Sequence, residues 1–108
     1  MSKLHPVTSD TFDSDVLQAN QPVLLEFGAE WCQPCRVLEP LLEQLAEDWE
    51  GHFTFAKLDV DQATEITARY GVLSVPTTIL FKDGQEVERI VGLQPKQKLW
   101  EKLAAHQQ

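Results

Sequence analysis

The segment AEWCQPCRVLEP, residues 29–40, holds both cysteines of this 108-residue chain. Two residues separate Cys32 from Cys35, and the second of them is a proline. An apolar run, PVLLEFG (22–28), precedes the pair, and apolar residues at helical spacing follow it up to residue 49. The run before the pair is typical of a strand buried on both faces, and the spacing after it of an amphipathic helix. The cysteines are therefore expected where a strand ends and a helix begins.

The remaining segments predict an α/β fold. FTFAKLDV (53–60) is a second strand, so that strand, helix and strand form a βαβ unit with parallel pairing. TTILF (77–81) and QEVERIVG (85–92) flank Lys-Asp-Gly, which predicts a hairpin. Helices are predicted over residues 8–19, 34–49, 63–71 and 95–106. We expect one domain, 1–108, with a central mixed sheet of four to five strands flanked by helices on both faces.

Prolines and tryptophans refine this fold. Pro6 cannot donate a ladder hydrogen bond, so any strand there belongs at a sheet edge. Pro40 lies inside the long helix and should kink it, and Gly51 stands where a helix C-cap would. Trp49 and Trp100 are expected in the core.

Composition excludes some classes of function. The formal net charge of −8 argues against nucleic-acid binding, because phosphates repel such a surface. No run approaches the roughly 20 apolar residues that span a bilayer, and MSKLHPVTSD (1–10) lacks the apolar region of a signal peptide. We expect a cytoplasmic protein without a membrane partner. In the cytoplasm, disulfides tend to be catalytic.

Four explanations compete for the cysteine pair. Structural zinc needs four ligands, and His5, His52 and His106 are scattered singly, so no metal site is expected. A structural disulfide over so short a loop removes little entropy from the unfolded chain. Two incidental thiols are the third possibility. Redox chemistry fits the placement best, because unpaired N–H groups and the helix dipole at a helix start stabilise a thiolate.

The two thiols should differ in acidity and in burial. The pKa of free cysteine is ~8.5, and a helix N-terminus can bring this value towards neutrality. Cys32 is therefore the candidate nucleophile. Cys35, one turn inside the helix, should be more buried and act as the resolving thiol. Pro34 fits the first turn without loss of a hydrogen bond and stiffens the dipeptide between the sulfurs.

Several motifs together resemble the thioredoxin family, in order and along the whole chain. They are EFGAEWCQPC, a helix with an internal proline, AKLDVDQ, YGVLSVPTTILFKDG and VGL. The resemblance implies a thioredoxin fold and a thiol–disulfide oxidoreductase that reduces protein disulfides. It implies disulfide-containing client proteins, recharging by a thioredoxin reductase, and no cofactor beyond the redox-active disulfide of Cys32 and Cys35. We expect a monomer.

Glu26 is the unexpected residue of the first strand. An unpaired carboxylate in a strand buried on both faces is costly, and burial should raise its pKa, which makes it a candidate proton relay. The alternative is a strand-end glutamate that reaches water. Relatives of the resembled family usually carry an aspartate here, thought to help Cys35 lose its proton, with a lysine nearby that matches Lys57. Taken alone, Lys57 would be an exposed strand lysine.

The resemblance also assigns a docking surface beside the cysteines. Val75 precedes a family loop whose proline, here Pro76, is cis, although the sequence alone favours trans. The backbone of Val75 is expected to pair with a client peptide as an added strand, and Gly92 to complete the apolar surface. Trp31, Gln33 and Pro34 are the other expected contacts, with Trp31 covering Cys32. Gly28 and Gln33 depart from the family pattern, which has a bulky aromatic and a glycine there.

Two other functions remain possible. A thioredoxin-like oxidant or isomerase would use the same chemistry at a higher redox potential. A non-catalytic binding module would keep the fold without turnover and would retain its partner when both cysteines are replaced by serine.

Overall fold

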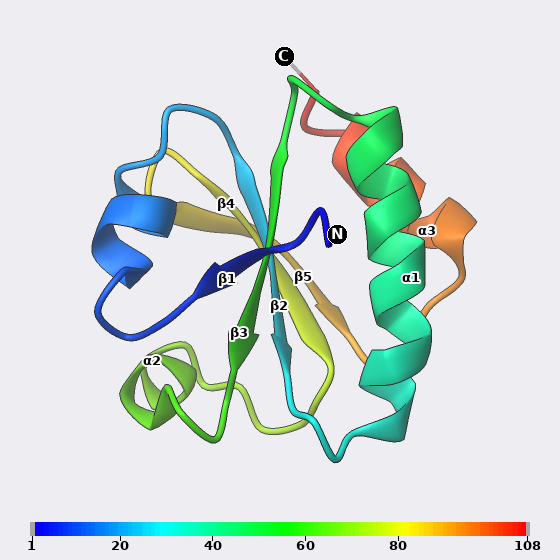
Figure 1. Ribbon diagram of the computed structural model, residues 1–108. Helices are drawn as coiled ribbons and strands as arrows, with labels where there is room; N and C mark the ends of the chain where they lie inside the picture. The colour runs from blue at the N-terminus through cyan, green and yellow to red at the C-terminus, as the bar shows by residue number, and fades with distance from the viewer. Residues whose placement is uncertain (1, 108) are drawn as a thin grey trace.

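The computed structural model describes residues 2–107, and its centre is one five-stranded mixed sheet (Figure 1). The strands are β1 (His5–Val7), β2 (Val23–Gly28), β3 (Thr54–Asp59), β4 (Thr77–Lys82) and β5 (Gln85–Val91), in the spatial order β1-β3-β2-β4-β5. β1, β3 and β2 run parallel, whereas β4 pairs antiparallel with β2 and β5. The predicted mixed sheet and parallel βαβ unit are confirmed, and Pro6 lies on an edge strand.

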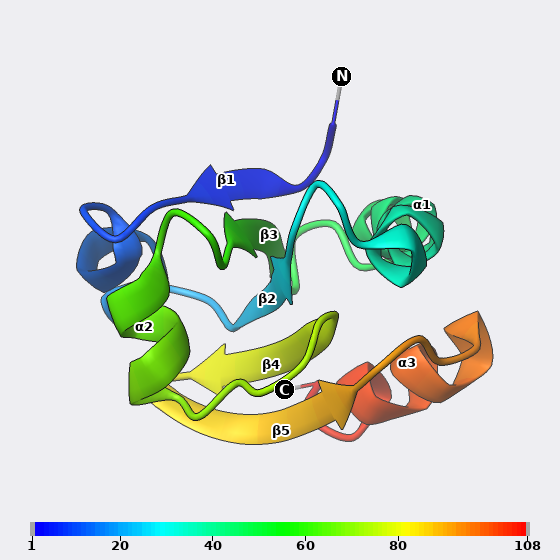
Figure 2. The same ribbon diagram turned by 90° about the horizontal axis from the view of Figure 1, so that it is seen from below.

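Helices cover both faces of the sheet (Figure 2). Helices α1 (Gln33–Asp48) and α3 (Lys96–Ala104) lie on one face, and η1 (Asp13–Leu17) and α2 (Thr64–Arg69) on the other. The sheet has a hydrophobic core on each face, and adjacent residues of β2 belong to different cores. Leu24 packs in the cluster under α1 and α3, and Leu25 packs in the cluster under η1 and α2. This alternation places Glu26 on the α1 face, where the cysteines are.

Helix α1 continues through Pro40 to Asp48, and Gly51 beyond it has a φ of +86°. The β4–β5 hairpin turns at Asp83 and Gly84, whose φ values of 53° and +77° are the left-handed pair that a tight two-residue turn requires. The turn expected from Lys-Asp-Gly is thus the one observed.

The helix expected over residues 8–19 is wrong in length, because only the five-residue π-helix η1 forms there. Thr8 and Thr11 explain the difference. The Thr8 N–H donates to Thr11 Oγ1 at 3.0 Å, and the Thr11 N–H donates to Thr8 Oγ1 at 3.3 Å. These side chains compete with helical hydrogen bonds and hold a turn instead. Phe12 and Val16 of this segment are buried.

Trp100 is not a core residue, contrary to expectation, since 41% of it is exposed. Its ring packs at the surface against the buried Trp49 in a tilted arrangement, with 5.4 Å between the centroids and 42° between the ring planes. Leu99 and Leu103 bury the inner side of α3 and leave Trp100 on its flank.

Candidate active site

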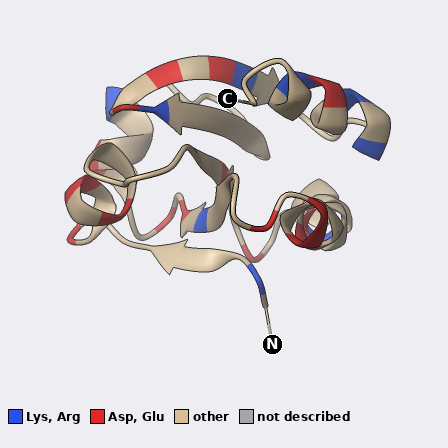
Figure 3. Ribbon diagram, turned by 90° about the horizontal axis from the view of Figure 1, so that it is seen from above, with Lys and Arg blue, Asp and Glu red and all other residues tan. Residues whose placement is uncertain are grey.

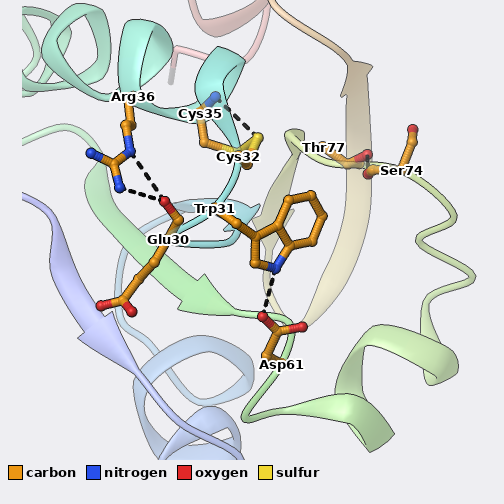
Figure 4. The surroundings of a disulfide bond; sticks show 8 residues. All are labelled: Glu30, Trp31, Cys32, Cys35, Arg36, Asp61, Ser74 and Thr77. Atoms are coloured by element: carbon orange, nitrogen blue, oxygen red, sulfur yellow. Dashed lines mark hydrogen bonds between the residues drawn. A yellow bond between two sulfur atoms is a disulfide. The ribbon is translucent and has the colours of Figure 1, made fainter.

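Cys32 and Cys35 form a disulfide at the start of α1 (Figure 4). Cys32 is the N-cap residue, and its Sγ accepts a hydrogen bond from the Cys35 N–H at 3.2 Å. This contact puts the sulfur at the positive end of the helix, where an anion is stabilised. Cys32 is 3% exposed and Cys35 0%, so the little access that exists is to Cys32.

The loop before the disulfide is held by two contacts that Figure 4 shows. The indole Nε1 of Trp31 donates to Asp61 Oδ2 at 2.8 Å, and the Arg36 guanidinium donates to the Glu30 carbonyl oxygen at 3.1 and 2.6 Å. Trp31 lies on the surface beside Cys32 with 68% of its area exposed. Gln33 and Pro34, in the first turn of α1, are exposed as well.

A second loop lies against the sulfurs. The Val75–Pro76 peptide bond is cis, and Val75 packs against the cluster of Ala29, Cys32 and Cys35. Pro76 is buried, and its carbonyl oxygen accepts from the Gly92 N–H at 2.8 Å. Within residues 2–107, neither the N–H nor the C=O of Val75 forms a hydrogen bond. A backbone with free donors and acceptors can pair with an extended peptide.

Glu26 is fully buried in the middle of β2, and within residues 2–107 neither of its carboxyl oxygens has a hydrogen-bond partner. It lies in register with Lys57 on β3 and Thr78 on β4. Burial raises the pKa of Glu26 to about 8, the charge of Glu39 adds to the rise, and the charge of Lys57 opposes it. The carboxyl group is therefore mostly protonated at neutral pH.

Gly28 separates this carboxyl group from the disulfide. A Cβ atom at Gly28 would lie 2.8 Å from Glu26 Oε2 and 3.3 Å from Cys35 Sγ. The carboxyl and the sulfur thus converge on the space that the missing side chain leaves. Glu26 also borders a cleft of about 650 Å³ that Gly28, Glu39 and Lys57 line as well.

The sequence matches known proteins over nearly its whole length. The family model described as Thioredoxin matches residues 3–105. Thioredoxins of Staphylococcus aureus strains Mu50, MW2 and N315 are each 49% identical to it over 100 residues, which is 93% of this chain and 94% of theirs. The chain belongs to the thioredoxin family. As a thioredoxin-family protein with a disulfide-bonded CxxC pair, it is a thiol–disulfide oxidoreductase that reduces protein disulfides.

The structure brings together the site residues expected of this thioredoxin-family protein. The residues around the Cys32–Cys35 disulfide are Trp31, Val75, Pro76 and Gly92. Glu26 and Lys57 lie beneath α1. Sequence analysis missed Glu39 and Thr78. Glu39 follows Cys35 by one helical turn, a spacing that puts both on one face, so the sequence does hold a signal for it. The sequence held no signal for Thr78, whose buried hydroxyl lacks a hydrogen-bond partner within residues 2–107.

Among the described residues 2–107, no three His, Cys, Asp or Glu side chains are grouped so as to hold a metal ion. Nor does any helix of that part have the length and apolar character needed to cross a membrane. Acidic residues occur in most parts of the molecule, whereas three of the nine basic residues, Lys96, Lys98 and Lys102, lie on α3 (Figure 3).

Proposed function

We propose that Cys32 is the attacking thiol and Cys35 the resolving thiol of this thioredoxin-family reductase, with Glu26 as the acid–base group for Cys35. The observation that carries the proposal is the placement of a protonated, buried carboxyl group next to Cys35, while Cys32 occupies the helix N-terminus. One thiol is thus favoured as an anion, and the other lies beside a carboxyl group that donates a proton when protonated and accepts one when ionised.

The reaction has two exchange steps. The Cys32 thiolate attacks one sulfur of a client disulfide, and the other client sulfur leaves as a thiolate that takes up a proton. Cys35 then gives its proton to the Glu26 carboxylate and attacks Cys32 Sγ. The Cys32–client bond breaks, the Cys32–Cys35 bond forms, and the client leaves reduced while the protein is oxidised.

Regeneration runs the same chemistry in reverse. A thiolate of a thioredoxin reductase attacks Cys32 Sγ and forms a mixed disulfide with it, and Cys35 departs with the bonding electron pair. A second thiol of the reductase then displaces the Cys32 thiolate, which leaves the dithiol reduced and the reductase oxidised. The protonated Glu26 supplies the proton that Cys35 takes up, which is the role that its raised pKa in the disulfide form allows. The electrons reside in the dithiol, so the cycle needs no metal or organic cofactor.

Client binding involves the surface next to Cys32. The free backbone of Val75 is suited to pair with an extended client segment, and the exposed Trp31 and Pro34 and the half-buried Gly92 border it. Lys57 acts through Glu26 by limiting the rise of its pKa. The protein is proposed to work as a monomer in the cytoplasm, where clients are reduced rather than oxidised.

The test is to trap the client. A Cys35→Ser variant keeps the attacking thiol and should accumulate mixed disulfides with client proteins that dithiothreitol releases, whereas Cys32→Ser should accumulate none. Absence of adducts in Cys35→Ser, with Cys32 still open to alkylation, would contradict the assignment. Equilibration with glutathione then distinguishes a reductant from an oxidant or isomerase of the same fold.

A further inference from the structure

The proton that Glu26 exchanges with Cys35 needs a route to water, because Glu26 itself is fully buried. Glu26 Oε2 and Cys35 Sγ approach each other at Gly28, where an added Cβ would lie 2.8 Å from the oxygen and 3.3 Å from the sulfur. Glu26 also borders a cleft of about 650 Å³, which Gly28 lines as well. A proton that reaches Glu26 from Cys35 can therefore leave through this cleft.

Glu39 lies at this cleft. It is half-buried on α1, one turn after Cys35, and lines the same cleft as Glu26. The other charged groups that face the cleft are Arg36 of α1, Lys57 and Asp59 of β3, and Glu30 of the loop after β2. Of these groups, Glu39 is the one whose negative charge raises the pKa of Glu26, whereas Lys57 lowers it.

Two neighbouring carboxyl groups can hold one proton between them, since two negative charges in a desolvated site repel each other. Such a proton is shared between a buried oxygen of Glu26 and a half-buried oxygen of Glu39. The half-buried member is in contact with water, so it can release or accept the proton without exposing the interior.

We propose that Glu39 is a positioning residue that shares a proton with Glu26 and carries it between Glu26 and solvent when the Cys32–Cys35 bond forms or opens. The inference rests on the proposed role of Glu26 and extends it. When Cys35 attacks, its proton passes to the Glu26 carboxylate, then to Glu39, and then to water. When the disulfide is reduced, the proton moves in the opposite direction to the departing Cys35 sulfur.

The test compares Glu39→Gln with Glu47→Gln, which removes the same charge from an exposed position two turns further along α1. The first readout is the titration of the Glu26 carboxyl carbon by NMR in the disulfide form, with the signal assigned by its loss in Glu26→Gln. Glu39→Gln should make Glu26 titrate at lower pH than in the wild type, and Glu47→Gln should leave the titration unchanged.

The second readout is the pH profile of the single-turnover resolution step, in which Cys35 displaces a chromogenic thiol from Cys32. In Glu39→Gln, its midpoint should move to lower pH and its high-pH plateau should fall several-fold, which is less than the ~10²–10⁴-fold typical of losing a general acid–base group outright. Glu39→Asp should restore part of the plateau.

An unchanged Glu26 titration in Glu39→Gln, or a shift equalled by Glu47→Gln, would overturn the inference. An unchanged pH profile would overturn it as well, whatever the titration shows. Both variants must first show the wild-type unfolding transition, which a conservative change at a half-buried position should preserve. The carboxyl titration needs no client, so its failure is distinguishable from failure of Cys35→Ser to trap one.

Discussion

Lys57 lies directly across the parallel β2–β3 ladder from Glu26, yet the buried carboxyl group keeps a pKa of about 8. Loss of hydration disfavours the carboxylate more than a half-buried ammonium group favours it. The pair is therefore unequal: the lysine limits the rise of the pKa without cancelling it.

The stability of the disulfide form should fall with rising pH. The Glu26 pKa is about 8 in the folded chain and 4.5 in the reference state, so the folded protein binds the proton more tightly. Stability from this group is fully present below pH 4.5 and is lost as the pH rises to about 8. Glu26→Gln should remove the slope and add a few kcal/mol at alkaline pH, since each pKa unit corresponds to about 1.4 kcal/mol.

Urea unfolding of wild type and Glu26→Gln across this pH range measures the effect. The exposed Glu47→Gln serves as the control and should keep the wild-type slope. Parallel pH profiles for wild type and Glu26→Gln would show that the carboxyl is ionised in the folded state at neutral pH.

Glu26→Gln should slow resolution by Cys35 more than attack by Cys32. The amide cannot take a proton from Cys35, whereas Cys32 is activated by the helix N-terminus and does not depend on Glu26. Stopped-flow measurements with a chromogenic disulfide separate the two steps. Equal slowing of both would argue for a structural role of the carboxyl group.

Lys57→Met should shift the pH profile of resolution in the alkaline direction. Without the opposing positive charge, the pKa of Glu26 rises further, so less carboxylate is present at neutral pH and resolution slows several-fold. Lys98→Met, an exposed change on α3, is the matched control. A shift of the profile to lower pH would contradict the electrostatic account.

Gly28 and Glu26 should be coupled in stability. Gly28→Ala places a Cβ 2.8 Å from Glu26 Oε2, and overpacking of this kind costs about 1–3 kcal/mol. In a Glu26→Asp background the shorter side chain leaves room, so the same change should cost less. A double-mutant cycle in urea, at acidic pH where both acids are protonated, should give a coupling of at least about 0.5 kcal/mol. Additive effects would mean that the two residues do not share this space.

The sequence predicted the structure correctly where the local pattern of apolar residues agrees with the burial that the fold imposes. The apolar run around Glu26 and the helical spacing after Cys35 predicted both the sheet position of the carboxyl group and the helix that covers it. The Asp83–Gly84 turn was equally readable, because its left-handed backbone needs such residues. The cis bond at Pro76 came from the family resemblance and not from its own residues.

Features that depend on competition between local and distant contacts could not be predicted from the sequence. Thr8 and Thr11 replaced the start of a predicted helix by a turn, although the apolar pattern was helical. Trp100 was displaced to the surface because Leu99 and Leu103 already fill the inner side of α3. The approach of Glu39 to Glu26 requires the packing of α1 on the sheet, which spacing along the helix cannot establish.

The most direct test of the account is titration of the Cys32 thiolate by its ultraviolet absorbance in the reduced Cys35→Ser variant, with Cys32→Ser as the blank. The sulfur at the N-terminus of α1 is predicted to ionise near neutral pH, well before a free thiol at ~8.5. A thiol that stays protonated well past neutrality and reacts with iodoacetamide no faster than free cysteine would contradict it.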